Sequence, residues 1–327
     1  MHELDRIDSL LLAELDKNSR QHLSSLAKKL HLGRDLVQYR IDKLKKEGVI
    51  RKFYMHLDPC KLGLTFYKMY LRLARDAQLQ KRLVSFLESQ PSVHWVGQCG
   101  GSWDIIFAVC FENPNEFYDF QNVIFSKFCS AIIDSDVAVI VKAGSFSATY
   151  SLGIAGRAFL FGEGPSHISL DKLEQGIISH LCHDTQLDIA VLAKRVKSST
   201  TTVRSRIEKL EKLGFIRGYR VDIDTTKIGL NTHKAQLFLA QHSAKLDQEL
   251  WAFCEKHPKI EYLVYQLGHA KVEIEVGATD YLEYERVIEE LEEAFPKVIH
   301  STRSMIVYSS QYRWSFSETR PYIGSPA

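Results

Sequence analysis

The chain contains the same passage twice. Residues 40–64 read RIDKLKKEGVIRKFYMHLDPCKLGL and residues 206–230 read RIEKLEKLGFIRGYRVDIDTTKIGL. The two align without a gap at an offset of 166 residues, with 12 of 25 positions identical. This spacing is much longer than the roughly 20–50 residues of a solenoid repeat. With 327 residues to accommodate, the sequence therefore predicts a tandem duplication of a module of about 150 residues.

Each module opens with apolar residues at helical spacing, and Asp5 and Asp171 stand where a helix would be capped. A second short helix fits residues 23–30 and 187–196. A third, amphipathic and basic, fits residues 34–47 and 200–213. Gly48 and Gly214 follow it at the position of a C-terminal capping glycine. Two short helices joined by a turn, the second of them basic, are typical of a helix-turn-helix.

After each glycine the apolar period changes from 3.6 to about 2. The pattern then predicts strand, helix, strand, strand, helix, strand, which is the ferredoxin-like βαββαβ order. The fold class expected is α+β, with two copies of a helix-turn-helix domain followed by a ferredoxin-like domain. The expected boundaries are 1–55 and 56–150 for copy 1, 151–168 for a linker with an extra strand near 158–161, and 169–221 and 222–327 for copy 2.

Basic charge gathers in the same part of each copy. Residues 20–56 hold ten Lys and Arg against three acids, and residues 186–222 hold nine against four. The net charge of the whole chain is only +2. Two local cationic surfaces on a nearly neutral scaffold are the pattern of a protein that binds a polyanion at two places. A solvated helix surface is the alternative explanation for any one such stretch.

Several classes of function have no support in the sequence. The six cysteines form no CxxC pair and the histidines form no HxH or HExxH motif, so we expect no metal and no disulfide framework. We also find no P-loop, dinucleotide-binding or nucleophile motif, so no cofactor and no enzymatic activity are expected. The longest apolar run is too short to cross a bilayer and the N-terminus is charged. We expect a cytoplasmic protein without a membrane partner.

The run L-A-x5-(G/S)-x3-V-x2-R-I-x2-L-x3-G-x-I-R occupies residues 26–51 and again residues 192–217. With the ferredoxin-like pattern behind it, this run resembles the Lrp/AsnC family of prokaryotic transcription regulators. The resemblance covers nearly the whole chain, twice, whereas family members usually carry one copy. It implies double-stranded DNA as a partner, a small effector such as an amino acid, and either a homo-oligomer or a pseudo-dimer within one chain.

In the regulator interpretation the third helix of each copy enters the major groove. The residues expected to contact bases and nearby phosphates are Arg34, Gln38, Tyr39 and Arg40 in copy 1, and Ser199, Thr200, Thr201, Thr202, Arg204 and Arg206 in copy 2. Further basic side chains of the second helices, of the end of the first copy's third helix and of the second copy's turn are expected to contact phosphates: Lys28, Lys29, Lys45, Lys46, Lys194, Arg195 and Lys197. Because the two third helices differ at nearly every exposed position, the sequence predicts an asymmetric or relaxed DNA site.

Some of these residues have a structural alternative. Arg40 and Arg206 lie close to the apolar stripe of their helices, so they could instead pair with Asp8 and Glu174 on the first helix of each copy. Lys45 and Lys46 could simply be solvated. Arg34 and Arg204 stand at or near the start of a third helix, where DNA contact is the favoured interpretation.

The family resemblance also implies an effector pocket at a G-x-(Y/W)-D turn. Copy 1 carries Gly101, Trp103 and Asp104 at this turn. The glycine would let the backbone approach the ligand closely, the indole ring would form an aromatic wall, and the carboxylate would pair with an ammonium group. Copy 2 reads Gly-His-Ala-Lys at 268–271 and lacks the ring and the carboxylate. The alternative is that Trp103 packs at a dimer interface and Asp104 ends a turn.

A second family shares the two-domain plan. The chain is also similar to the sirohaem decarboxylases, in which paired modules bind a tetrapyrrole and histidines carry the chemistry. His94 and His233 are the candidates for that role, although both fall in expected strands. The intact basic third helix in each copy favours the regulator. The sequence leaves open whether the two ferredoxin-like domains pair within one chain or between two.

Overall fold

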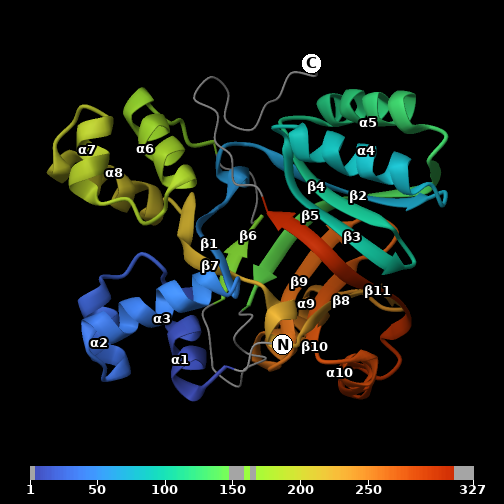
Figure 1. The fold of residues 1–327 in the computed structure, drawn as a ribbon. Helices are drawn as coiled ribbons and strands as arrows, with labels where there is room; N and C mark the ends of the chain where they lie inside the picture. Colours follow the sequence, from blue (N-terminus) through green and yellow to red (C-terminus); the bar gives the residue numbers. More distant parts are fainter. Residues whose placement is uncertain (1–3, 147–157, 163–166, 313–327) are drawn as a thin grey trace.

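The structure, a computed structural model, describes residues 4–146, 158–162 and 167–312 (Figure 1). Two three-helix heads lie at one side of the molecule, and the sheets with their covering helices lie at the other. The first head consists of α1 (Arg6–Lys17), α2 (Leu23–Leu30) and α3 (Arg34–Lys46), and the second of α6 (Lys172–His183), α7 (Ile189–Arg195) and α8 (Thr200–Lys212).

The head helices begin and end where their capping residues predict. Asp5 accepts the backbone N–H of Asp8 at the start of α1, and Asp171 forms a capping box with Glu174 at the start of α6. Gly48 follows α3 with φ +76°, and Gly214 follows α8 with φ +73°. Only glycine adopts this left-handed conformation without strain, so it can satisfy the last helical carbonyls.

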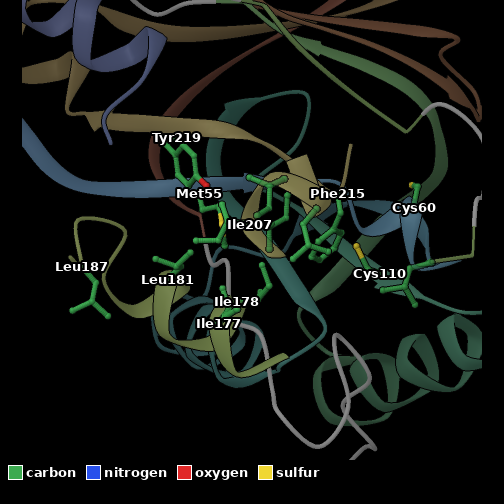
Figure 2. Packing of buried hydrophobic residues seen from close by; sticks show 14 of the residues in the cluster. Met55, Cys60, Cys110, Ile177, Ile178, Leu181, Leu187, Ile207, Phe215 and Tyr219 are labelled. Atoms are coloured by element: carbon green, nitrogen blue, oxygen red, sulfur yellow. The ribbon is translucent and has the colours of Figure 1, made fainter. Parts of the chain in front are cut away.

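A two-stranded ribbon joins the heads. β1 (Ile50–Leu57) pairs antiparallel with β7 (Ile216–Ile223), one strand from each copy. Val221 and Ile223 of β7 belong to the core of the first head, whereas Met55 of β1 belongs to the core of the second. Figure 2 shows this second core, with Met55 above Ile178 and Leu181 of α6. Each head therefore packs against the strand of the other copy.

Short 3-10 turns, η1 (Pro59–Lys61) and η3 (Thr225–Ile228), connect the ribbon to two βαββαβ units. The first unit is β2 (Thr65–Leu73), α4 (Ala77–Ser89), β3 (Val93–Gly101), β4 (Ile105–Phe111), α5 (Pro114–Phe128) and β5 (Ile132–Ser145). The second is β8 (Asn231–Leu239), α9 (Ala244–Lys256), β9 (Ile260–Leu267), β10 (Val272–Ala278), α10 (Tyr281–Ala294) and β11 (Ile299–Tyr312). The predicted α+β fold class is confirmed, and α4 and α9 each end shortly before a proline, which cannot continue a helix.

The two units pair within the chain. β3 pairs with β11 and β5 pairs with β9, both antiparallel. With the β2–β5 pairing, the strands close into a ring in the order β2-β4-β3-β11-β8-β10-β9-β5. β6 (Phe159–Phe161) adds to the end of β5, as the extra strand expected in the linker. The question that the sequence left open is therefore answered in favour of an intramolecular pseudo-dimer.

The side chains divide into an outer and an inner layer. On the outside, α4 and α5 cover an apolar layer of the first sheet, and α9 and α10 cover the second (Figure 1). The inner faces of the two sheets meet over Tyr70, Trp95 and Trp103, beside a buried polar network of Lys68, Lys234, Glu273 and Glu275. Pairing the two copies is what removes these charged groups from water.

Candidate nucleic-acid interface

The outward face of α3 carries the residues expected to meet DNA in copy 1. Arg34, Gln38 and Tyr39 are exposed, and Tyr39 keeps 64% of its surface accessible although it is a large aromatic residue. The opposite face of the helix is buried in the head. Gln38 donates to the carboxylate of Asp42 at 3.0 Å, one turn along the same face. The exposed face of α3 is therefore polar, aromatic and cationic.

In copy 2 the expected residues gather at the start of α8. The hydroxyl of Ser199 accepts the backbone N–H of Thr202 at 3.0 Å, so Ser199 is the N-cap of α8. Thr200, Thr201 and Arg204 are exposed beside it. Gly33, at the equivalent place before α3, offers no side-chain cap. A hydroxyl-rich helix start with an arginine one turn later is suited to contact phosphate.

Arg40 and Arg206 make the ion pairs that the structural alternative described. Arg40 contacts Asp5 at 2.7 Å and Asp8 at 2.6 Å, and its side chain is 18% exposed. Hydrogen bonds to these two carboxylates raise the pKa of Arg40 above its ordinary value. Arg206 contacts Asp171 and Glu174, each at 3.0 Å. Both arginines thus tie the third helix to the first helix of their own head, and their contact with DNA stays a prediction.

The lysines expected to contact phosphates lie around the third helices, and they differ in whether their side chains already contact other residues. Lys28 and Lys194 are exposed on α2 and α7. Lys29 is exposed too, but its ammonium group donates to Glu14 at 2.8 Å and to Gln21 at 2.9 Å. Lys45 lies 4.9 Å from the ring centroid of Phe53. Exposed pairs such as Lys29–Glu14 contribute little free energy and can exchange for a phosphate.

The two heads contact each other directly. Gln186 donates to the backbone carbonyl of Ser19 at 2.8 Å, and Arg20 donates to the carbonyl of Thr185. The guanidinium of Arg20 also lies 5.7 Å from the ring centroid of Tyr219 in the ribbon. These contacts join the α1–α2 and α6–α7 loops, and with the ribbon they fix the position of one head relative to the other. No sequence pattern pointed to Arg20, because its hydrogen-bond partner Thr185 is 165 residues away.

Arg220 is a second residue that the sequence analysis missed. It lies on β7 and forms a bidentate ion pair with Asp16 of α1, with hydrogen bonds of 2.7 and 2.6 Å. Its guanidinium also donates to the backbone carbonyl of Phe146 at 2.7 Å. It is 3% exposed. Copy 1 has Tyr54 at the equivalent position of β1. A single buried arginine therefore ties the first head, the ribbon and the end of β5 together.

The residues expected to form an effector pocket do not come together. The Trp103 ring is 4% exposed between the two sheets, and its indole N–H donates to Gln236 at 3.1 Å. The carboxylate of Asp104 accepts the backbone N–H of Leu73 at 2.7 Å. Gly101 lines a cavity together with Gly100 and residues of copy 2. Trp103 thus packs at the pseudo-dimer interface, as the structural alternative described.

Two smaller cavities lie between the ribbon and the ring of strands. One of about 60 Å³ is lined by His56, His94 and Lys68 among others, and one of about 120 Å³ includes Arg51 and Arg220. Both are below the roughly 300–1,000 Å³ of sites for small molecules and cofactors. Burial lowers the pKa of His94 to about 3, so its ring is neutral at neutral pH.

Two kinds of feature are absent from the part of the chain that the structure describes. Within residues 4–146, 158–162 and 167–312, His, Cys, Asp and Glu side chains form no group of three or more suited to a metal ion. Over the same residues, none of the helices combines the length and the apolar character needed to cross a bilayer.

Comparisons with known proteins match both heads. A winged helix-turn-helix DNA-binding domain matches residues 4–51, and an AsnC-type helix-turn-helix domain matches residues 170–211. An uncharacterized HTH-type transcriptional regulator of Pyrococcus furiosus is 39% identical over 115 residues, which are 35% of this chain and 77% of that protein. Another from Pyrococcus horikoshii is 32% identical over 141 residues, which are 43% of this chain and 93% of that protein.

A solved structure matches the chain over both copies. The siroheme decarboxylase NirDL, also solved with an iron-uroporphyrin III analogue, has a TM-score of 0.63 against this chain. The match covers 96% of this chain and 95% of that one at 13% sequence identity. At this identity the likeness concerns the fold, and it includes the arrangement of two modules in one chain.

Proposed function

The chain belongs to the Lrp/AsnC family of helix-turn-helix proteins, and from this premise we propose that it is a sequence-specific DNA-binding transcription regulator. The observation that carries the proposal is the pair of exposed and basic third helices, α3 and α8, on two heads held together by one ribbon. Most of the polar contacts of such heads go to phosphates, which supply affinity, whereas base edges supply specificity.

We assign the two kinds of contact to different residues. Arg34, Gln38 and Tyr39 of α3, and Thr200, Thr201 and Arg204 of α8, are exposed and face away from the core of their heads, which suits base edges and nearby phosphates. Arg40 and Arg206 hold the third helices in position through their ion pairs with α1 and α6. Since Arg34 aligns with Thr200 and Gln38 with Arg204, the two halves of the DNA site are expected to differ.

Fluorescence anisotropy tests the proposal. The purified chain would be titrated onto DNA from upstream of its own gene and onto scrambled DNA, at several salt concentrations, beside the double variant Arg34→Glu with Arg204→Glu. We expect tight binding whose affinity falls steeply with salt, and a clear loss of affinity in the double variant. The matched control is Lys81→Glu with Lys245→Glu, which places the same charge change on exposed lysines of α4 and α9, away from the heads.

Two results would contradict the proposal. One is the absence of binding to either DNA; the other is an equal loss of affinity in the test and control variants, which would mean that net charge rather than the third helices carries binding. A weaker salt dependence in the test variant alone would support contacts between these two arginines and phosphates.

We further propose that the regulator acts in the cytoplasm, responds to a small effector such as an amino acid, and forms higher oligomers of the pseudo-dimer.

A second candidate function is a tetrapyrrole enzyme of the sirohaem decarboxylase type. The fold shared with NirDL over both modules favours it, as do the buried His56 and His94 beside the ring of strands. The cavity beside these two histidines has a volume of only about 60 Å³, which speaks against it. Titration with iron-uroporphyrin III distinguishes the two functions. A saturable shift of the Soret band, lost in His94→Ala, would support the enzyme, whereas an unshifted band together with DNA binding would support the regulator.

A further inference from the structure

Two large apolar side chains lie exposed on α3, the third helix of the first head. Leu36 keeps 41% of its surface accessible and Tyr39 keeps 64%. Residues three apart on a helix lie on the same face, so the two side chains form one exposed apolar pair on the first two turns of α3. Leu36 is not among the residues that the sequence predicts to contact DNA.

The internal repeat shows that α3 does not need this pair in order to fold. At the equivalents of Leu36 and Tyr39, α8 carries Thr202 and Ser205. Both helices are 13 residues long. The buried positions of both are apolar and match one to one: Val37, Ile41 and Leu44 in α3, and Val203, Ile207 and Leu210 in α8. The Leu36–Tyr39 pair therefore serves a contact outside the helix.

Cationic side chains accompany the pair. Arg34 is exposed at the start of the helix. Lys43 and Lys46 follow Tyr39 at four and seven residues, so they continue the same face; Lys43 is half-buried and Lys46 is exposed. A helix surface with apolar groups among cations is complementary to a partner whose edges are anionic and whose centre is apolar. The major groove of DNA has this arrangement, because phosphates border it and base edges form its floor.

The apolar pair selects among the base edges. In the major groove thymine presents a C5 methyl group, whereas adenine, guanine and cytosine present hydrogen-bond donors and acceptors without a methyl group. Leucine cannot satisfy those polar groups, so packing Leu36 on them would desolvate them without compensation. Packing on a methyl group instead removes apolar surface of both partners from water. Leu36 and the ring of Tyr39 are therefore suited to thymine.

The start of α8 has a different chemistry. It presents the hydroxyl groups of Thr200 and Thr201, which can donate to a phosphate. α3 has the exposed carboxylate of Asp35 where α8 has Thr201. Because like charges repel, Asp35 disfavours a phosphate at this position. The two heads thus differ in kind, with apolar contact favoured in the first and hydrogen bonding to phosphate in the second.

We propose that the first head recognises thymine: Leu36 and the ring of Tyr39 pack on C5 methyl groups in the major groove, while Lys43 and Lys46 contact the adjacent phosphates. The inference rests on the proposed DNA-binding function and adds the base that α3 selects. The half of the DNA site under the first head is therefore rich in A·T pairs. The half under the second head depends little on thymine methyl groups.

Replacing thymine by uracil tests the proposal, because the two bases differ only in the C5 methyl group and pair alike with adenine. The DNA from upstream of the gene would be synthesised with either base, and the full chain titrated onto both forms by fluorescence anisotropy at one salt concentration. The test variant is Leu36→Thr with Tyr39→Ser, which gives α3 the residues of α8. The matched control is Leu282→Thr with Tyr118→Ser, which removes the same side chains from exposed positions of α10 and α5.

We expect the wild type to bind thymine DNA more tightly than uracil DNA, by about four-fold for each methyl group contacted, since burial of one such carbon contributes about 0.8 kcal/mol. The ratio of the two affinities should fall to about one in the test variant and stay at the wild-type value in the control. The circular dichroism of the test variant should match that of the wild type, because α8 forms the same helix with these residues.

Two results would overturn the proposal while leaving the DNA-binding function in place: equal affinity of the wild type for both DNAs, or the same ratio in the wild type and the test variant. Absence of binding to either DNA would overturn both. Sedimentation velocity without DNA examines the other occupant of this surface. If the test variant loses self-association and keeps the wild-type ratio, the pair contacts a second copy of the chain and the proposal is wrong.

Discussion

At the scale of single residues, the buried charges of this protein are balanced only across the two copies. Lys68 and Lys234 occupy equivalent positions of β2 and β8, and both contact Glu273 of β10. Lys234 also contacts Glu275. Copy 1 has Ile106 and Ala108 in place of these two acids. Two copy 1 sheets facing each other would bury lysines without acids, so this network favours the pairing of unlike copies.

The network predicts a dependence of stability on pH. Burial raises the pKa of Glu273, but Lys234 and Lys68 outweigh it and hold that pKa at about 2, below the ordinary 4.5. A carboxyl whose pKa is lowered by folding stabilises the folded state above its unfolded pKa, and this contribution is lost as the pH falls from about 4.5 to about 2. Glu273→Gln should therefore reduce the free energy of unfolding by about 3–5 kcal/mol at pH 7.

Urea unfolding of the wild type and the variant between pH 7 and pH 2 would measure this difference. We expect it to narrow in acid, because the wild type then loses the same charge. Glu208→Gln, at an exposed position of α8, is the control and should show little difference at any pH. If the free energies of unfolding of the wild type and Glu273→Gln differ by the same amount down to pH 2, the ionised Glu273 does not stabilise the fold.

Arg220 leads to a second prediction at this scale. Arg220→Met leaves the 2% exposed Asp16 without its cation, which should lower the free energy of unfolding by about 3–5 kcal/mol. The control is Arg51→Met on the neighbouring strand, whose pair with Asp224 at 3.0 Å involves a side chain that is 39% exposed. Its expected cost is at most about 1 kcal/mol. Equal losses in the two variants would mean that the burial of Arg220 is not decisive.

At the scale of the elements, the two third helices differ in how they begin. The Ser199 hydroxyl caps α8, whereas Gly33 leaves α3 without a side-chain cap. The first turn of α8 is therefore stabilised locally, by the hydrogen bond from the backbone N–H of Thr202 to the Ser199 hydroxyl. α3 depends more on packing, through Val37, Ile41 and Leu44, which are all buried in the head.

Ser199→Ala should consequently destabilise the second head by about 1 kcal/mol, the usual cost of removing a serine N-cap. Ser205→Ala, on the exposed face of the same helix, is the matched control and should stay within about 0.5 kcal/mol of the wild type. Thermal unfolding followed by circular dichroism measures both. If the two variants unfold at the same temperature, the cap does not stabilise α8.

At the scale of the whole molecule, the ring of strands makes the two copies one cooperative structure. The second head extends this connection, because its core continues through Met55 and Cys60 to Cys110 of β4 (Figure 2). The first head is joined through the ribbon, through Arg220 and through the contacts of its α1–α2 loop. Both heads are thus held to one framework.

Because the two sheets pair within one chain, the ring should survive dilution. We expect the near-ultraviolet circular dichroism signal and the unfolding temperature to stay constant when the protein is diluted a hundred-fold from about 10 μM. Dissociation of any larger assembly should not change these two quantities. Pairing between chains would instead make the unfolding temperature fall with concentration. A fall accompanied by loss of the aromatic signal would contradict the intramolecular ring.

The sequence by itself determined the elements and their order. The second and third helices of each head lie within a few residues of the ranges that their apolar spacing predicted, and the strands and helices behind them follow in the order predicted by the change of apolar period after Gly48 and Gly214. The pairs Arg40–Asp8 and Arg206–Glu174, which the sequence offered as an alternative to DNA contact, also form. These features depend on neighbours along one helix or between helices of one small head, so the sequence pattern records them.

Only the tertiary structure decided how the copies combine. The same strand edges satisfy their hydrogen bonds whether β3 meets β11 in its own chain or in another, so no local pattern distinguishes the two. Trp103 was expected in a pocket but lies between the sheets, because the pairing of the copies buries it against Gln236. Such features follow from which surfaces meet, and that is settled by packing in three dimensions.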